Sequence, residues 1–268
     1  MSIAFFVLSQ WLFAVRLPDS NDQSLPCRPT IACTADIVAP GAFEIELGYL
    51  VRHLSLPAWQ HTTPFLLKLS VVEWAQLQLS SNGMTFQSGA QQARYFDNIQ
   101  VGAKFHPLQQ SKFVPSISFS AAYSFPTANG QLGYVRTNDL ELIAYITKDF
   151  GWLHVDLNIG VNIFRLERKP LTQGFFALAL SGAIGKGFGV LGEGYYFSRA
   201  QPLVDRDAGI LLGFTYAARS WLVFDVGGDI GLISTVRGFS LFTGMTIVPV
   251  DLWDTVAEKM RRTSHNPK

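Results

Sequence analysis

The stretch LHVDLNIGVNIF (153–164) alternates apolar and polar or glycine residues without a break. Leu153, Val155 and Leu157 begin the apolar series, and His154 and Asp156 begin the polar one. A period of two predicts a β-strand with one apolar face. About ten residues are enough for a tilted strand to cross a bilayer, whereas strands of soluble proteins usually have about five or six.

The same alternation recurs along the chain, at 43–49, 99–105, 117–124 and 222–232. Weaker examples complete a set of about twelve segments, near 64–70, 73–80, 139–147, 175–184, 188–198, 208–217 and 239–248. Since single-chain barrels of the bacterial outer membrane have an even number of strands, we predict an all-β fold, a transmembrane antiparallel up-and-down β-barrel of about twelve strands.

Composition agrees with this prediction. Hydrophobic residues make up 48% of the 268 residues and charged residues only 15%, yet we find no apolar run long enough for a membrane helix. The formal net charge of +1 argues against a nucleic-acid partner. Connections near 52–63, 81–94, 125–138, 165–173 and 199–207 are long and alternate with short ones, as extracellular loops alternate with periplasmic turns. Both termini are therefore expected in the periplasm of a bacterium, with outer-membrane lipid around the barrel.

The chain divides into four predicted regions. Residues 1–20 resemble a signal peptide, although no basic residue precedes their apolar run; an apolar N-terminal helix is the alternative. Residues 21–42 are predicted as a periplasmic N-terminal segment, 43–248 as the outer-membrane barrel, and 249–268 as a C-terminal amphipathic helix or tail. Cys27 and Cys33 form either a small disulfide loop or two free thiols.

Charged residues on the polar face of the strands are expected to face the lumen, because a charge facing hydrocarbon costs about 2–4 kcal/mol. The predicted lumen-lining residues are Glu44, Glu46, Lys104, Asp156, Glu193, Asp225 and Asp229. They line a water path or fill the interior as a polar plug. Aromatic residues near strand ends, among them Tyr49, Trp59, Trp152, Tyr195 and Trp221, predict interfacial girdles.

No catalytic, metal or cofactor site is predicted. Gly187, Gly189 and Gly192 match a dinucleotide-binding pattern, but the residues that follow indicate a strand where a helix is required. His154 lies on the predicted lumen side without a positioned serine, which does not favour a lipid hydrolase. The chain is therefore not expected to be an enzyme.

Three runs resemble a known family: VEWAQLQLSSNG (72–83), DNIQVGAKF (97–105) and PSISFSAAYSFPTANG (115–130). They are similar to the "MetA pathway of phenol degradation" family of outer-membrane transporters, with Gly102 and Lys104 in the second run and Phe125–Thr127 in the third. Glu193 and Asp225 also resemble that family. The chain departs from it at 74–76, at 128–129 and in the C-terminal tail.

The resemblance implies uptake of small molecules, aromatic or hydrophobic ones among them. The expected function is thus an outer-membrane pore or passive transporter. A structural or adhesive barrel without conductance and, less favoured, an outer-membrane lipid hydrolase are the alternatives. The sequence indicates neither the solute nor the oligomeric state.

Overall fold

The computed structural model describes residues 23–54, 58–89, 92–127, 138–166, 169–199, 206–233 and 237–253. Almost all of them belong to one antiparallel sheet that closes on itself where β15 pairs with β1. Its strands are β1 (Ala42–Leu54), β2 (Ala58–Thr62), β3 (Phe65–Val72), β4 (Ala75–Ser81), β5 (Met84–Gln87), β6 (Ala93–Phe96), β7 (Ile99–Leu108), β8 (Ser116–Phe125), β9 (Asn138–Phe150), β10 (Leu153–Leu166), β11 (Lys169–Gly185), β12 (Phe188–Phe197), β13 (Asp207–Arg219), β14 (Leu222–Ile233) and β15 (Arg237–Asp251).

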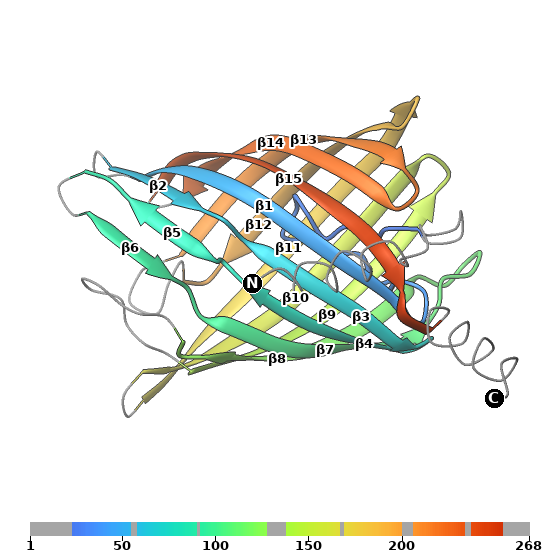
Figure 1. Ribbon diagram of the computed structural model, residues 1–268, viewed down its shortest axis with the longest axis horizontal. Coiled ribbons are helices and arrows are strands. Elements are labelled where there is room, and N and C mark those ends of the chain that lie inside the picture. Colours follow the sequence, from blue (N-terminus) through green and yellow to red (C-terminus); the bar gives the residue numbers. More distant parts are fainter. Residues whose placement is uncertain are drawn as a thin grey trace, which may run out of the picture.

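The fifteen labelled strands form a twelve-stranded wall, because three pairs of labels mark single strands that are interrupted. β2 and β3 pair with successive parts of β1 and so form one interrupted strand. β4 and β5 form the second interrupted strand, and β6 and β7 form the third. The predicted barrel of about twelve strands is confirmed. Figure 1 shows its tilted strands, with β1, β3 and β15 in front of β10–β12.

The three interruptions lie side by side, at Thr63–Pro64, Asn82–Gly83 and Asp97–Asn98. Hydrogen bonds continue across them, from Thr63 N–H to Met84 O (3.1 Å) and from Asp97 N–H to Gly83 O (2.8 Å). Gly83 has a φ of +66°, and a Cβ there would lie 2.1 Å from Thr63 O. A side chain would therefore clash with the neighbouring strand.

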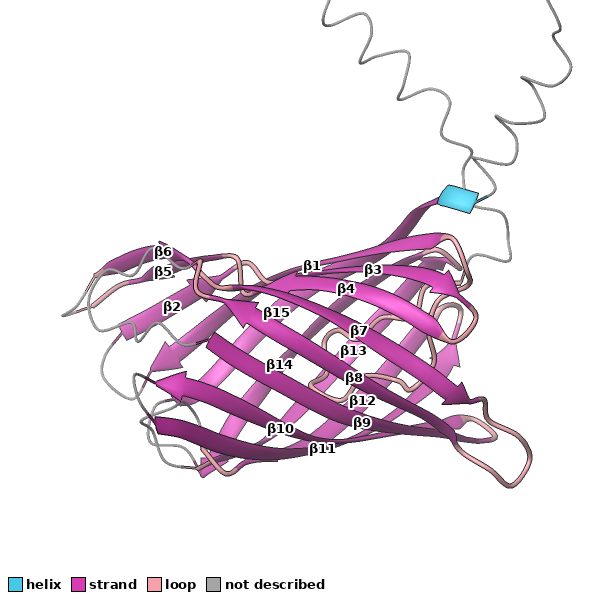
Figure 2. Cartoon of the chain, turned by 90° about the horizontal axis from the view of Figure 1, so that it is seen from below, coloured by secondary structure: helices cyan, strands magenta, loops and turns pink. Residues whose placement is uncertain are grey.

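Connections at one end of the barrel are mostly tight turns: 73–74, 151–152, 186–187 and 220–221 have two residues each, and 109–115 has seven. We call this the turn end. The short helical turn that follows β15 also lies there (Figure 2), and its Leu252 N–H donates to Gly41 O (2.8 Å). At the opposite loop end, the predicted long loops at 52–63, 81–94 and 165–173 are wrong: paired strands extend into them and leave connections of 55–57, 88–92 and 167–168. In the first of these extensions Arg52 and Gln60 pair on one face, and His53 and His61 lie on the other, so the alternation fades although pairing continues.

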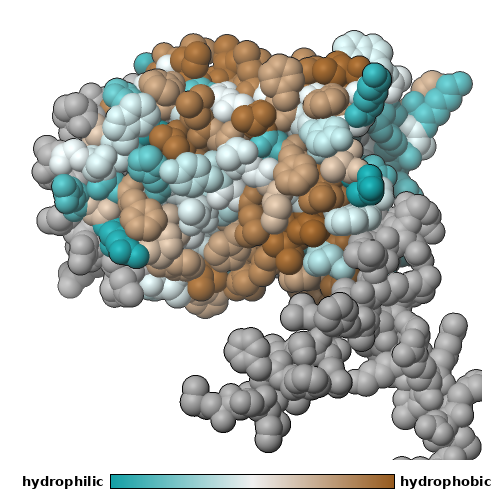
Figure 3. Space-filling model, turned by 45° about the horizontal axis from the view of Figure 1, so that its top comes forward, coloured by the Kyte–Doolittle hydropathy of each residue, from teal (hydrophilic) through white to brown (hydrophobic). Residues whose placement is uncertain are grey.

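The outer face of the wall is apolar. On β13, for example, Leu212 is 64% exposed, whereas the preceding Leu211 is 4% exposed and points inward. Exposed apolar side chains on other strands include Leu77, Val101, Phe119, Ile159, Val226, Ile230 and Leu241. On the face shown in Figure 3, hydrophobic side chains gather in broad patches over the wall. This is the inside-out pattern that a lipid environment requires.

Aromatic residues follow the predicted girdles in part. Tyr49, Trp59 and Trp152 are exposed on the outer side or at a turn. Tyr195 is an exception, because it lies 4% exposed on the inner face, and its neighbour Tyr196 faces outward. Trp221 packs against Val38 and Val248 at the turn end.

Residues 1–22 and 254–268 lie outside the described residues, and with them the predicted signal peptide and most of the predicted C-terminal helix. Strand β15 extends to Asp251, three positions beyond the predicted limit, and only Leu252 and Trp253 follow it in helical conformation. None of the described helices is long and apolar enough to cross a membrane.

Candidate functional site: an occupied lumen

The structure places all seven predicted lumen residues on the inner face of the wall. Glu44 and Glu46 lie on β1, Lys104 on β7, Asp156 on β10, Glu193 on β12, and Asp225 and Asp229 on β14, each at most 8% exposed. Asp156 and Asp229 bond to wall residues. The other five contact a separate part of the chain that lies in the space between them, which the alternation alone does not reveal.

That part is residues 24–38, which we call the lumen segment. Its residues contact inner side chains of β1, β3, β7, β8, β9 and β12, so it lies inside the barrel. The expectation of a periplasmic segment over residues 21–42 does not match this placement. Such a short stretch without periodicity cannot bury its own backbone groups, and the polar wall supplies their partners.

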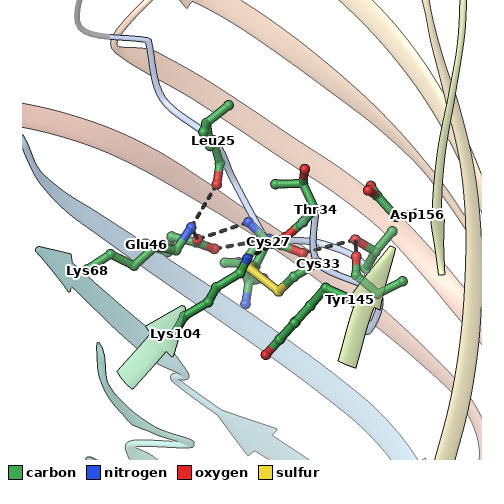
Figure 4. Close-up of a disulfide and its surroundings, with 12 residues drawn as sticks. Leu25, Cys27, Cys33, Thr34, Glu46, Lys68, Lys104, Tyr145 and Asp156 are labelled. Atoms are coloured by element: carbon green, nitrogen blue, oxygen red, sulfur yellow. Dashed lines mark hydrogen bonds and ion pairs between the residues drawn. A yellow bond between two sulfur atoms is a disulfide. The ribbon is translucent and has the colours of Figure 1, made fainter. Parts of the chain in front are cut away.

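The lumen segment enters and leaves at the turn end. Ser24 N–H donates to Ser220 O (2.9 Å) in the turn before β14, and Val38 packs against Ala42 and Val248 where β1 begins. Between these points the segment makes a loop into the barrel, closed by a disulfide between Cys27 and Cys33. Figure 4 shows this loop with Glu46, Lys68, Lys104 and Tyr145 directed toward it.

Wall carboxylates accept hydrogen bonds from the backbone of the segment. Glu44 accepts from Leu25 N–H (2.6 Å). Glu46 accepts from the N–H groups of Cys27 (2.9 Å) and Arg28 (3.0 Å). Across the lumen, Glu193 accepts from the N–H groups of Ile31 (2.8 Å) and Ala32 (2.6 Å). The acidic wall thus satisfies backbone donors that would otherwise be buried without partners.

Wall lysines and hydroxyls bind the carbonyls of the segment. Lys68 Nζ donates to Leu25 O (2.7 Å) and also pairs with Glu44 and Glu46, at 2.6 and 2.5 Å. Lys104 Nζ donates to Thr34 O (2.5 Å) and Asp36 O (3.2 Å), and lies 4.3 Å from the ring centroid of Tyr145. Ser118 donates to Ala35 O. Both lysines therefore stabilise the closed arrangement through backbone groups.

One side of the lumen is apolar. Ala32 of the segment packs against inner residues of β11, β12, β13 and β15, namely Ala177, Ala179, Leu191, Tyr195, Leu211 and Phe242. Phe175 and Phe197 stack nearby, with ring centroids 5.5 Å apart. The interior thus combines charged groups with an aromatic and aliphatic surface.

Nearer the loop end, inner polar side chains bond to one another across strands. Gln100 donates to Glu141 (3.3 Å), and Asn162 donates to Gln173 (2.6 Å). Between the segment and the β3–β7 side of the wall, a narrow gap lined by Leu25, Asp36, Lys68, Gln76, Gln78 and Lys104 remains.

The described histidines do not reproduce a hydrolase triad. His106 Nε2 lies 2.8 Å from Ser116 Oγ, but both residues are on the inner wall, and Asp36 Oδ1 approaches that same nitrogen at 3.5 Å. A triad needs the acid on the other ring nitrogen. His154 contacts Asp149 (2.6 Å) and Asp156 (3.1 Å) instead of a serine. Gly187 occupies the turn before β12, and Gly189 and Gly192 lie within that strand, not at a helix N-terminus.

Comparison with known proteins places the fold among outer-membrane barrels. An outer membrane channel from Pseudomonas putida F1 superposes with a TM-score of 0.59 at 11% identity, covering 87% of this chain and 99% of that one. The NanC porin gives 0.54 at 9% identity (77% and 99% covered), and the KdgM porin 0.53 at 11% (76% and 98%).

No family model and no curated protein matches the chain, so the resemblance to the "MetA pathway of phenol degradation" family stays a prediction. The solved structures are similar in fold: the chain has the architecture of a twelve-stranded outer-membrane β-barrel.

Proposed function

We propose that the protein is a passive channel of the bacterial outer membrane, closed in the described state by its lumen segment. The observation that carries this proposal is the way in which the interior of the barrel is filled. The interior is occupied by a separate loop held mainly through hydrogen bonds to its backbone. Departure of that loop would leave a conduit lined by polar residues and, on one side, by apolar ones.

Wall side chains fill the interior of a barrel of about eight strands on their own, whereas in this wider wall a separate loop takes that place. The three porins and channels of similar fold support the channel class. In this proposal both termini lie on the periplasmic side, since four of the five connections at the turn end are two-residue turns. The segment therefore enters the lumen from the periplasm.

Small solutes with an aromatic or hydrophobic part are the proposed cargo. Phe175 and Phe197 stack, and the Tyr195 ring centroid lies 6.0 Å from that of Phe197, so the three rings provide an inner surface for such groups. The seven charged residues of the wall would hold water and polar solute groups along the path.

Controlled release of the segment tests the channel. Ala39 and Pro40 are exposed and connect the segment to β1, so a protease recognition sequence inserted between them allows it to be cut from a folded barrel. Planar-bilayer recordings should show a large stepwise rise in conductance after cleavage. The control carries the same sequence after Lys112, in the exposed turn between β7 and β8, where a cut leaves the segment attached.

A cleaved barrel that keeps its heat-modifiable gel mobility, loses its segment and still passes no current would overturn the proposal. It would favour the structural or adhesive barrel.

A further inference from the structure

The side chain of Arg28, in the lumen segment, contacts both a side chain and a backbone carbonyl of the wall. Its Nε lies 3.7 Å from Asp225 Oδ2, and its Nη2 donates to Thr243 O at 3.4 Å. The two charged side chains are 16% and 3% exposed, respectively. The guanidinium thus lies on the inner face beside the seam where β15 meets β1.

Two glycines make room for it. Gly48 and Gly244 are directly opposite each other in the β1–β15 pairing. A Cβ at Gly48 would lie 2.2 Å from the Arg28 Cζ, and one at Gly244 would lie 2.6 Å from its Nε. Real atoms do not approach this closely, so a Cβ at either position would clash with the guanidinium. The planar guanidinium therefore lies directly on backbone that only glycine leaves uncovered. A flat floor beside a carboxylate matches the shape and charge of a guanidinium.

Asp225 retains unused bonding capacity. Among the described residues, its buried Oδ1 has no hydrogen-bond partner, and the Arg28 Nε also lacks one. A carboxylate so deeply buried normally accepts several hydrogen bonds. Arg28 of the segment therefore occupies the site without using the full hydrogen-bonding capacity of Asp225, as expected of an occupant that can be exchanged.

We propose that Asp225, Thr243 O and the Gly48–Gly244 floor form a binding site for solutes that carry a guanidinium group, and that Arg28 is its resident competitor. This rests on the proposed channel function and extends it by naming the solute chemistry. When the segment leaves, the site faces the lumen, and Glu46 and Asp229 add negative charge on the neighbouring parts of β1 and β14. Cationic solutes enter, and the Asp225 site holds those with a planar cation.

The test uses the barrel cleaved between Ala39 and Pro40, with methylguanidinium as the probe and methylammonium and acetate for comparison. Methylguanidinium should bind in saturation-transfer NMR and block potassium current, and acetate should do neither. Asp225→Asn should weaken binding and block by about tenfold or more, the change expected when a charge-assisted interaction is lost.

Two matched variants separate the site from general charge. Asp229→Asn removes the same charge from the same strand, where Asp229 bonds to Tyr195, and should reduce the preference for potassium over chloride while leaving the methylguanidinium block nearly unchanged. Gly48→Ala keeps every charge but fills the floor. It should weaken the block and leave the ion preference in place.

The NMR measurement does not require current, so the two proposals fail separately. Absence of conductance with retained, Asp225-dependent binding would contradict the channel alone. Conductance without methylguanidinium binding, or with binding that Asp225→Asn and Gly48→Ala leave unchanged, would overturn the guanidinium site. Gel mobility of each variant confirms that the barrel is folded.

Discussion

The replacement Glu193→Gln tests how strongly the wall holds the lumen segment. The carboxylate accepts hydrogen bonds from Ile31 and Ala32, at 2.8 and 2.6 Å, and is 3% exposed. Glutamine has one oxygen to offer and presents an N–H₂ group to the other donor. At least one bond is lost, and the remaining one is no longer charge-assisted.

A hydrogen bond to a charged group contributes about 1.5–3 kcal/mol, so the closed state should lose about 2–3 kcal/mol. At about 1.4 kcal/mol per factor of ten, the equilibrium shifts toward segment release by about 30- to 140-fold. Hydrogen exchange measured by mass spectrometry should show this acceleration for amides of residues 25–35, with the strand amides unchanged.

Glu141→Gln is the matched control, since Glu141 bonds to Gln100 on the inner wall nearer the loop end. It should leave exchange in the segment as it is. Equal exchange in Glu193→Gln and in the unaltered chain would refute the idea that the carboxylate anchors the segment. Acceleration throughout the barrel would mean that Glu193 stabilises the wall instead.

Three further changes probe the segment and the outer wall. Replacing Cys27 and Cys33 together by serine should weaken retention of the segment by about 2 kcal/mol, the value for a short disulfide loop, and speed exchange of its amides; unchanged exchange would contradict a constraining role. Lys104→Met keeps an unbranched side chain that is one atom shorter and removes the donor to two segment carbonyls, so the same amides should exchange faster by a factor equivalent to about 1–3 kcal/mol. If they do not, Lys104 does not hold the segment. Leu212→Arg should lower barrel stability in lipid vesicles by about 2–4 kcal/mol in urea titrations, and an unaltered midpoint would show that this face is not in hydrocarbon.

The wall of the barrel could be predicted from the sequence because its pattern depends on residues that are close together in the chain. Lipid on one side and a polar interior on the other impose a period of two, and 153–164 shows it without interruption. The same rule located Glu44, Asp156 and Glu193 on the inner face. It failed at the strand extensions beyond 52, 81 and 165, where polar residues such as Arg52 and His53 interrupt the alternation.

The occupant of the lumen was not predictable in this way. Residues 24–38 have no periodicity, and their recognition runs through backbone groups that every sequence possesses. Arg28 gave no signal of its own, because its partners Asp225 and Gly244 lie about two hundred positions away along the chain. The tyrosine pair 195–196 shows the remaining limit: composition marks aromatic residues as interfacial, but register decides which one enters the lumen.

Neighbouring positions on β13 offer the most direct test of the central claim, that the apolar face meets lipid and the polar face encloses the segment. A single fluorophore is attached to a new cysteine at Leu211 or Leu212, the native cysteines being joined to each other. In vesicles of brominated lipid, the label at 212 should be strongly quenched and the label at 211 protected. Equal quenching at both positions, or stronger quenching at 211, would contradict the account.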